Sequence, residues 1–279
     1  MTAAADPRRR PDAPGRLLPG ERRFGRLNAL GFLTLCKREV LRFSSVWTQT
    51  LMAPVATALL FLTVFSLAVG PSRGEVMGVA FLTFLAPGVV MMQVVQNAFA
   101  NASSSLMIAK VQGSIVDTLM PPLSAAELVA GYVVGSVVRG LAVAAVTAAV
   151  MFPFTGAGLA HWGWALVFVL VASTILGLAG LLAALTAEKF DQMAAITNFV
   201  VTPLSFLSGT FYSVEALPGA LKLIAYVNPV FYLIDGFRFG TLGVSDVSPW
   251  IGLGVTSAVA AGLARLAWLA FDRGWKLKP

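Results

Sequence analysis

The sequence predicts an all-α integral membrane protein with six transmembrane helices. Of its 279 residues, 57% are hydrophobic and only 12% are charged, whereas a soluble domain carries about a quarter charged residues. Several apolar runs have roughly the 20 residues that cross a hydrocarbon core of about 30 Å. These runs are too long and continuous for the strands of a membrane barrel, so they predict helices.

The N-terminal region is strongly basic. Ten of the 20 Lys and Arg residues precede Ser44. Positive charge beside a membrane span is first a topology signal, so we expect a membrane partner rather than nucleic acid. Residues 1–23 are predicted to form a disordered basic cytoplasmic tail, and residues 24–279 are predicted to form one transmembrane domain. Within it, residues 24–43 mix apolar and basic positions, which favours an interfacial helix; an ordinary solvated helix is the alternative.

The six predicted spans cover about residues 46–69, 76–100, 126–151, 162–186, 193–207 and 250–271. Pro87 predicts a kink in the second span. The fifth span is short, and a long semi-polar stretch separates it from the sixth.

The distribution of Lys and Arg predicts the topology. With the N-terminus inside, 16 basic residues fall in cytoplasmic segments, and three fall in outside segments: Arg73, Lys222 and Arg238. Arg139 lies within the third span. An excess of Lys and Arg marks the cytoplasmic side. We therefore expect a multi-pass protein of the cell inner membrane with both termini in the cytoplasm.

A polar stretch, residues 113–132, interrupts the apolar runs on the predicted cytoplasmic side. It predicts a short helix with Ile115, Val116 and Leu119 as an apolar stripe, ended by two prolines. Ser124 then predicts the N-cap of the next helix, with Glu127 as its capping-box partner. Such a stiff element is suited to docking, although a loop that only turns the chain around is the simpler alternative.

The sequence offers no catalytic machinery. It lacks the G-x-x-x-x-G-K-[ST] loop that binds nucleotide phosphates, and its single histidine, His161, and single cysteine, Cys36, are far apart. We therefore expect a non-enzymatic chain with no cofactor and no metal.

Residues 110–124, KVQGSIVDTLMPPLS, resemble the cytoplasmic coupling segment of ABC-2 type transporter permeases. The run TPLSFLSGTFY at 202–212 and the run VNPVFYLIDGFR at 227–238 are similar to the same family's signature before the last span. The stretches PGVVMM at 87–92 and NAFANASS at 97–104 bring the chain closest to the YadH-like subgroup. Related permeases often carry an acidic residue directly after the coupling glycine, where this chain has Ser114.

The resemblance implies that a partner protein supplies the nucleotide-binding site that this chain lacks. It implies a homodimer that pairs with two copies of a separate ABC ATPase subunit, whose closure a cytoplasmic coupling helix transmits. The residues it implies for ATPase coupling are Lys110, Gln112, Gly113, Val116, Asp117, Leu119, Pro121, Pro122 and Glu127.

Two further regions are candidates for the transport path. Arg139, near mid-bilayer, is costly to bury there and therefore needs a partner or a polar surrounding; a structural role between helices is the alternative. The resemblance also implies a periplasmic re-entrant segment between helices 5 and 6 that closes the exit, although aromatic anchoring alone would explain its rings. Its candidate gate residues are Ser208, Gly209, Phe211, Tyr212, Pro218, Asn228, Pro229 and Tyr232.

The expected function is therefore the permease subunit of an ATP-driven exporter. Two alternatives stay open. A secondary, ion-coupled carrier would need membrane-embedded acidic residues, and we expect no Asp or Glu to be buried within the six predicted spans, since Glu127 stands at the very start of the third. A non-transporting membrane assembly factor would explain the absence of chemistry but not the coupling segment. The sequence does not identify a cargo.

Overall fold

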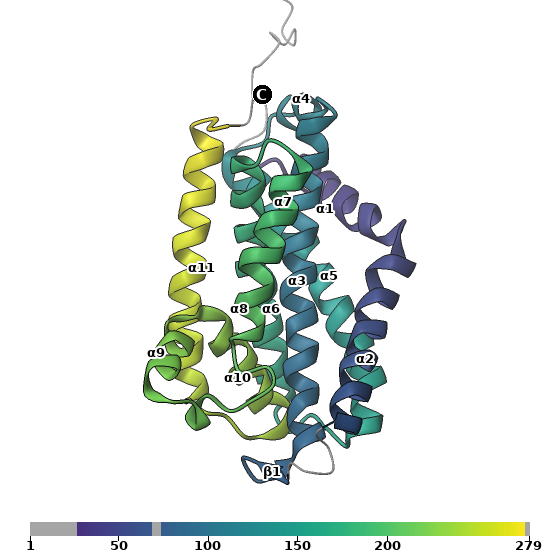
Figure 1. Cartoon of the computed structure of the whole chain (residues 1–279). Coiled ribbons are helices and arrows are strands. Elements are labelled where there is room, and N and C mark those ends of the chain that lie inside the picture. The colour runs from purple at the N-terminus through teal and green to yellow at the C-terminus, as the bar shows by residue number, and fades with distance from the viewer. Residues whose placement is uncertain (1–26, 69–73, 277–279) are drawn as a thin grey trace, which may run out of the picture.

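The computed structural model describes residues 27–68 and 74–276, and within them the chain forms one elongated helical bundle (Figure 1). The helices are α1 (Ala29–Ser44), α2 (Ala53–Ala68), α3 (Phe81–Val111), α4 (Ile115–Leu119), α5 (Ala125–Thr155), α6 (Trp162–Thr186), α7 (Phe190–Ile196), α8 (Thr202–Phe206), α9 (Gly219–Val227), α10 (Pro229–Leu242) and α11 (Pro249–Asp272). Two π-helical turns, Thr48–Met52 and Thr197–Val201, lead into α2 and α8, and a 3-10 turn covers Val214–Ala216. The strands β1 (Glu75–Val76) and β2 (Val79–Ala80) form a small antiparallel hairpin.

Five helices of the described chain are long and apolar enough to cross a membrane. They are Thr48–Ala68, Phe81–Val111, Ala125–Thr155, Trp162–Thr186 and Pro249–Asp272. The helical membrane class is therefore confirmed, and five of the six predicted spans have a counterpart. The predicted tail, residues 1–23, and the predicted end of the first span at Val69 lie outside the described residues.

The second predicted span, residues 76–100, is wrong at both ends. Residues 75–80 form the hairpin, whose turn residues Met77 and Gly78 have φ angles of 55° and 77°, the left-handed pair that a two-residue hairpin turn requires. α3 then continues through Pro87 to Val111 as one 31-residue helix. Its polar C-terminal third stays helical because side chains such as Asn101 are buried against neighbouring helices.

The fifth predicted span, residues 193–207, corresponds to a continuous helical run over residues 190–206. This run contains a π-helical turn and has 17 residues, slightly fewer than a typical membrane crossing. After it, α9 and α10 are joined at Asn228 and are bent by 87° relative to each other. The crossing number is therefore five by length alone, or up to six if the bent pair forms one span.

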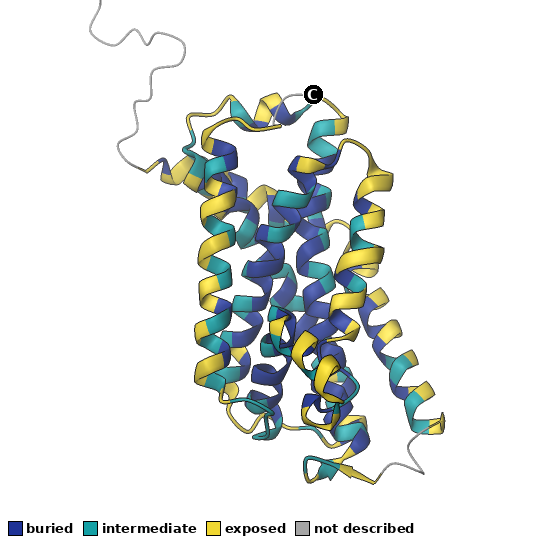
Figure 2. Ribbon diagram, turned by 60° about the vertical axis from the view of Figure 1, so that its left-hand side comes forward, coloured by how far each residue is buried: buried dark blue, intermediate teal, exposed yellow. Residues whose placement is uncertain are grey.

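α3 and α6 form the centre of the bundle. In their most apolar stretches 78% and 61% of the residues are buried, against 17% in α11 and 22% in the first span; Figure 2 shows the buried residues along the middle of the molecule. Gly180 of α6 makes the close approach possible, because a Cβ there would lie 2.5 Å from the carbonyl oxygen of Phe99 in α3. Small residues permit such contacts between membrane helices.

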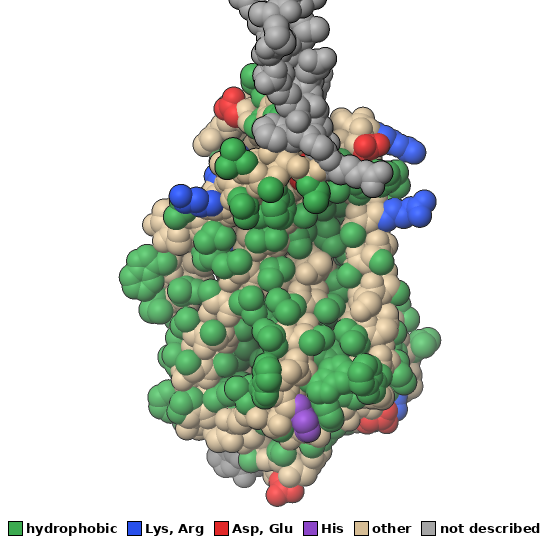
Figure 3. Space-filling view, turned by 180° about the vertical axis from the view of Figure 1, so that it is seen from behind, with side chains coloured by type: hydrophobic (Ala, Val, Ile, Leu, Met, Phe, Trp, Pro, Cys, Tyr) green, Lys and Arg blue, Asp and Glu red, His purple; other side chains and the backbone are tan. Residues whose placement is uncertain are grey.

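The two ends of the bundle differ. α1, α4 and the end of α11 lie at one end, whereas α9 and the hairpin β1–β2 lie toward the other (Figure 1). The face seen in Figure 3 is covered mainly by hydrophobic side chains, and its Lys and Arg side chains stand mostly toward the upper end. This pattern is typical of a protein whose middle lies in lipid.

Candidate functional site

The predicted coupling segment contains the short helix α4, which has an inner and an outer face. Ile115 and Thr118 are buried, and Leu119 packs partly buried against the core. Val116 and Met120 are instead 55% and 76% exposed, and Asp117 is exposed beside them. The predicted apolar stripe is therefore divided: Ile115 and Leu119 hold α4 in place, while Val116 faces outward.

Sharp turns bound α4 on both sides. Gly113 has a φ of +71°, a left-handed conformation that glycine adopts without steric cost, and it lets the chain turn between α3 and α4. Pro121 and Pro122 are exposed and follow α4 directly. Gln112, Gly113, Val116 and Asp117 are exposed as well, so six of the nine candidate coupling residues lie on the surface around α4.

Two other candidates have structural partners instead. Lys110 Nζ donates hydrogen bonds to the carbonyl oxygens of Ala184, Leu185 and Ala187, at 3.0, 3.0 and 2.8 Å. A cation at a helix C-terminus satisfies carbonyls that the helix leaves without partners. Lys110 thus connects α3 to the end of α6, an inward role that the sequence did not reveal.

Glu127 is buried and joins the starts of two helices. It forms the predicted capping box with Ser124, whose backbone N–H and hydroxyl both donate to it at 2.6 Å. Glu127 also accepts a hydrogen bond from the backbone N–H of Asn28, the N-cap of α1. The carboxylate therefore holds the start of α1 against the start of α5.

Glu39 of α1 lies at the centre of a polar cluster that no sequence pattern indicated. Its side chain is fully buried and accepts hydrogen bonds from Ser105 of α3 at 2.9 Å, Arg38 at 3.1 Å and Arg42 at 3.3 Å. Arg38 also donates to the hydroxyl of Thr118 in α4 at 2.9 Å, and Arg42 donates to the carbonyl of Asn101 in α3 at 2.8 Å. The cluster links α1 to both α4 and the central helix α3.

Gly131 and Gly135 of α5 let α1 approach closely. A Cβ at Gly131 would lie 2.5 Å from Leu35 Cδ2, and one at Gly135 would lie 2.7 Å from Glu39 Cβ. The spacing of four places both glycines on one helix face, as in other close helix contacts. Two glycines four residues apart favour close helix packing, but they do not identify the partner helix, which is α1.

Arg139 lies between α5 and α3. Its Nη2 donates to Asn97 Oδ1 at 2.8 Å, while its Nε is buried without a hydrogen-bond partner. Asn97 is one of three polar side chains, with Gln93 and Asn101, that are spaced four residues apart along α3. The buried amide nitrogens of Gln93 and Asn101 also have no partner, so a polar strip runs along this part of α3.

We predict that Arg139→Leu folds with a stability within about 1 kcal/mol of wild type. The lost hydrogen bond to a charged group is worth about 1.5–3 kcal/mol, but the substitution also removes a buried charge whose Nε has no partner, a cost of similar size, so the two effects nearly cancel. Thermal unfolding in detergent measures the change. Cargo transport by the folded variant then separates the two roles: loss assigns Arg139 to the transport path, and retention assigns it to helix packing.

Comparison with known proteins decides the family. The profile of the ABC-2 type transporter family matches residues 31–242. The chain is 35% identical over 241 residues to the inner membrane transport permease YadH of Escherichia coli K12, covering 86% of this chain and 94% of that protein. The chain is an ABC-2 type transporter permease. It is also 25% identical over 235 residues to nodulation protein J of Rhizobium leguminosarum bv. viciae, covering 81% of this chain and 88% of that protein.

The candidate gate of the permease lies toward the end of the bundle opposite α4 (Figure 1). Asn228 is its central connection: its Nδ2 donates to the Leu204 carbonyl at 2.9 Å and to Ser208 Oγ at 2.7 Å, and its Oδ1 caps α10 by accepting from the backbone N–H of Val230 at 3.0 Å. Pro229 follows as the first residue of α10, where a missing N–H costs nothing. One asparagine therefore fixes the bend between α9 and α10 against the end of α8.

Arg238 of the permease was predicted to lie in an outside loop, but it is the largest fully buried side chain of the described residues. Its Nη2 donates to the carbonyl of Gly209 at 2.7 Å, and its guanidinium carbon lies 4.0 Å from the ring centroid of Phe84. Its Nη1 lies 3.6 Å from Asp235 Oδ1. Arg238 therefore holds the gate segment and α3 together.

Asp235 is a buried acid outside the six predicted spans. Its two carboxylate oxygens accept hydrogen bonds from the backbone N–H groups of Asp246 and Val247 at 2.8 and 2.9 Å. With Arg238 as its cation, this carboxylate is fully engaged in holding the loop before α11. The spacing of three residues on one helix was the only sequence signal for this pair.

The remaining candidate gate residues fall into two groups. Gly209 has a φ of +73°, and after it Phe211 stacks on Phe65 of α2 at a ring-centroid distance of 5.0 Å. Tyr212 and Tyr232 pack instead with the small apolar cluster around α9, and the Tyr232 hydroxyl donates to the Tyr226 carbonyl at 3.0 Å. The structure therefore divides the predicted gate residues between the main core and this small cluster.

Two contacts complete this region. A Cβ at Gly88 would lie 2.4 Å from the carbonyl oxygen of Thr210, so this glycine lets the gate segment lie directly on α3. Pro218 precedes α9, and the exposed Glu215 accepts hydrogen bonds from Lys222 at 2.5 Å and Tyr226 at 2.7 Å. The hydrogen bond from Lys222 lowers the pKa of the Glu215 carboxyl. Within residues 27–68 and 74–276, no group of His, Cys, Asp and Glu side chains could hold a metal ion.

Proposed function

We propose that this permease forms the translocation path of an ATP-driven exporter, as a homodimer with two copies of a separate ATPase subunit. The whole stretch of residues 24–279 acts as the transmembrane domain, with α1 at the cytoplasmic interface, six crossings and both termini in the cytoplasm. YadH, the relative with 35% identity, is named an inner membrane transport permease, which supports the same membrane for this chain.

The outer face of α4 carries the proposal. Val116 and Met120 are exposed apolar side chains on a helix whose other face is fixed in the bundle. An exposed apolar surface with a polar rim is typical of a protein interaction site. Asp117 and Gln112 supply that rim beside the two exposed prolines. Members of this family pair with an ABC ATPase, so an ATPase subunit is the proposed partner.

α3 provides a route from this surface to the outer gate. Near its C-terminal end, α3 is hydrogen-bonded to α1: Ser105 donates to Glu39, and the carbonyl of Asn101 accepts from Arg42. Near its N-terminal end it contacts the gate through Phe84. A continuous helix transmits a displacement over its whole length, so movement of α4 and α1 reaches the segment held by Arg238.

The experiment that tests this function uses Val116→Asp. A carboxylate on the exposed apolar face would be buried without a partner in the docked complex, which costs several kcal/mol. We expect a co-expressed ABC ATPase that co-purifies with the wild-type permease to lose its stimulation by the variant in proteoliposomes, while membrane insertion and elution volume stay unchanged.

Val116→Ile is the matched control, because it keeps the apolar surface and should retain stimulation. Stimulation by Val116→Asp at the wild-type level would reject α4 as the docking element. Transport by the permease alone, driven by an ion gradient without nucleotide, would reject the exporter and favour the secondary carrier.

A further inference from the structure

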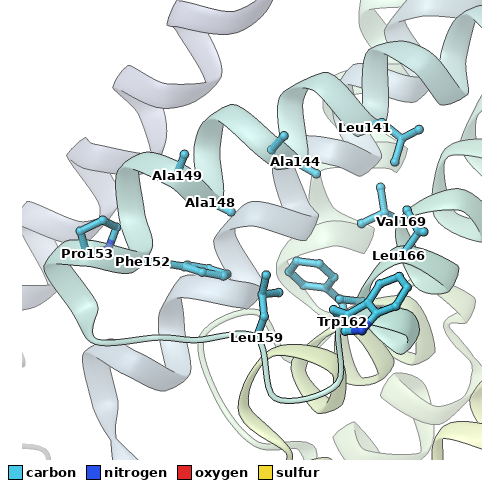
Figure 4. A pocket seen from close by; sticks show the side chains of 13 residues that line it. Leu141, Ala144, Ala148, Ala149, Phe152, Pro153, Leu159, Trp162, Leu166 and Val169 are labelled. Atoms are coloured by element: carbon cyan, nitrogen blue, oxygen red, sulfur yellow. The ribbon is translucent and has the colours of Figure 1, made fainter.

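A pocket of 570 Å³ lies between α5 and α6, away from both the α4 surface and the gate hydrogen bonds. Figure 4 shows its lining: small and large apolar side chains from the C-terminal part of α5 face the first turns of α6 across an open space. Phe237 of α10 also lines the pocket. The volume is within the range of about 300–1,000 Å³ that small-molecule sites occupy.

The pocket exists because α5 and α6 are in close contact around Gly140 and Gly177 and are farther apart beyond that contact. A Cβ at Gly140 of α5 would lie 2.0 Å from Ser173 Oγ of α6, and one at Gly177 would lie 2.8 Å from Ser136 Cβ. These contacts bring the helices together next to Leu141, where the pocket begins. From there to the loop that joins them, alanines on α5 leave the space unfilled.

The opening of the pocket faces outward from the bundle. Ala145 and Ala149 of α5 and Leu166 of α6 are exposed, whereas Ala165 and Val169 are buried beneath them. α5 and α6 are both candidate membrane spans, so the medium outside the opening is lipid hydrocarbon. No lining residue carries a charge or a carboxyl, amide or hydroxyl group. The one polar side-chain group is the indole N–H of Trp162 at one end, so the rest of the pocket offers water or a polar headgroup no side-chain partner.

The length of the pocket fits one leaflet. Its lining on α5 runs from Leu141 to Pro153, which is about 18 Å at 1.5 Å per residue. Half of a hydrocarbon core of about 30 Å is about 15 Å. At one end Trp162, a residue type typical of the membrane interface, stands beside the loop, and Figure 4 shows Leu159 of that loop reaching toward the pocket.

We propose that this pocket binds one acyl chain of a resident membrane lipid. A chain entering past Trp162 would lie along the alanines of α5 with its end near Leu141. A helix of a second copy, about 10 Å across, is a poorer fit because the α5–α6 loop closes one end. Phe237 lies at the inner wall next to Arg238, so the bound chain contacts the helix that holds the outer gate.

The test fills the pocket with Ala148→Trp, because Ala148 lines it between the two ends. Ala258→Trp is the matched control, since Ala258 is an exposed alanine on the span α11 outside the pocket. Purified full-length protein is exchanged into detergent containing dioleoyl phosphatidylglycerol, and native mass spectrometry counts retained lipid. We expect one tightly held lipid per wild-type chain, about tenfold weaker retention in Ala148→Trp, or about 1.4 kcal/mol, and no change in Ala258→Trp.

Equal lipid retention by all three proteins would overturn the proposal. The proposal would also be overturned if wild type were a dimer without bound lipid and Ala148→Trp were a monomer, because the pocket would then be a contact between subunits.

If Ala148→Trp does not fold, wild type is compared with Trp162→Phe in bilayers containing chain-brominated lipid. The emission of Trp162 should be quenched at a bromolipid fraction well below that needed for the other tryptophans; quenching in proportion to the bulk fraction would indicate ordinary boundary lipid and overturn the site. This test does not depend on the exporter function.

Discussion

Arg238→Leu is expected to destabilise the folded permease by about 3–5 kcal/mol, the range found when one partner of a buried ion pair is removed. Asp235 would remain 2% exposed without its cation. The Gly209 carbonyl and the ring of Phe84 would lose their contacts at the same time. We therefore expect a lower midpoint of thermal unfolding in detergent together with loss of export.

The control for Arg238→Leu is a second ion pair of the same region. Lys222 and Glu215 are in contact at 2.5 Å, but Glu215 is 56% exposed, and solvated pairs contribute little. Lys222→Leu should therefore change stability much less. Adding Asp235→Asn to Arg238→Leu should restore part of the loss, because the amide oxygen still accepts a backbone hydrogen bond without leaving a buried charge. A wild-type midpoint for Arg238→Leu alone would contradict the assigned role.

Gly135→Leu is expected to displace α1 and to uncouple the ATPase. The new Cβ would lie 2.7 Å from Glu39 Cβ, and overpacking of this kind costs about 1–3 kcal/mol. Since Glu39, Arg38 and Arg42 connect α1 to α3 and α4, moving α1 breaks the whole cluster. The five candidate spans do not depend on α1, so the variant should still insert.

The single cysteine measures the displacement directly. Cys36 lies on α1 and is partly buried, and burial raises the pKa of its thiol. Thiolate is the reactive form, so undocking should lower that pKa and speed labelling by maleimide at neutral pH. Gly262→Leu is the control, because a Cβ at Gly262 of α11 meets nothing within 4 Å. Unchanged labelling of Gly135→Leu would show that α1 tolerates the side chain and that the contact is not decisive.

The candidate coupling residues show how far sequence reasoning reaches at a surface. The prolines, Gly113 and the Ser124–Glu127 capping box were predictable because local backbone geometry dictates those residue types. Lys110 was not, because its three carbonyl partners come from α6, more than 70 residues away. A lysine beside a docking motif has the same local pattern whether it points outward or inward.

The sequence by itself determined the membrane class, the limits of α6 and α11, and the break at the two prolines. It could do so because hydrocarbon imposes a length and an apolar composition on each span, and prolines end helices locally. Only the tertiary structure decided that α3 continues past Asn101, that Arg238 is buried with Asp235, and that α1 packs on the glycines of α5. Those outcomes depend on partners distant in sequence: a polar side chain stays in a membrane helix only when another helix satisfies it, and no local pattern names that helix.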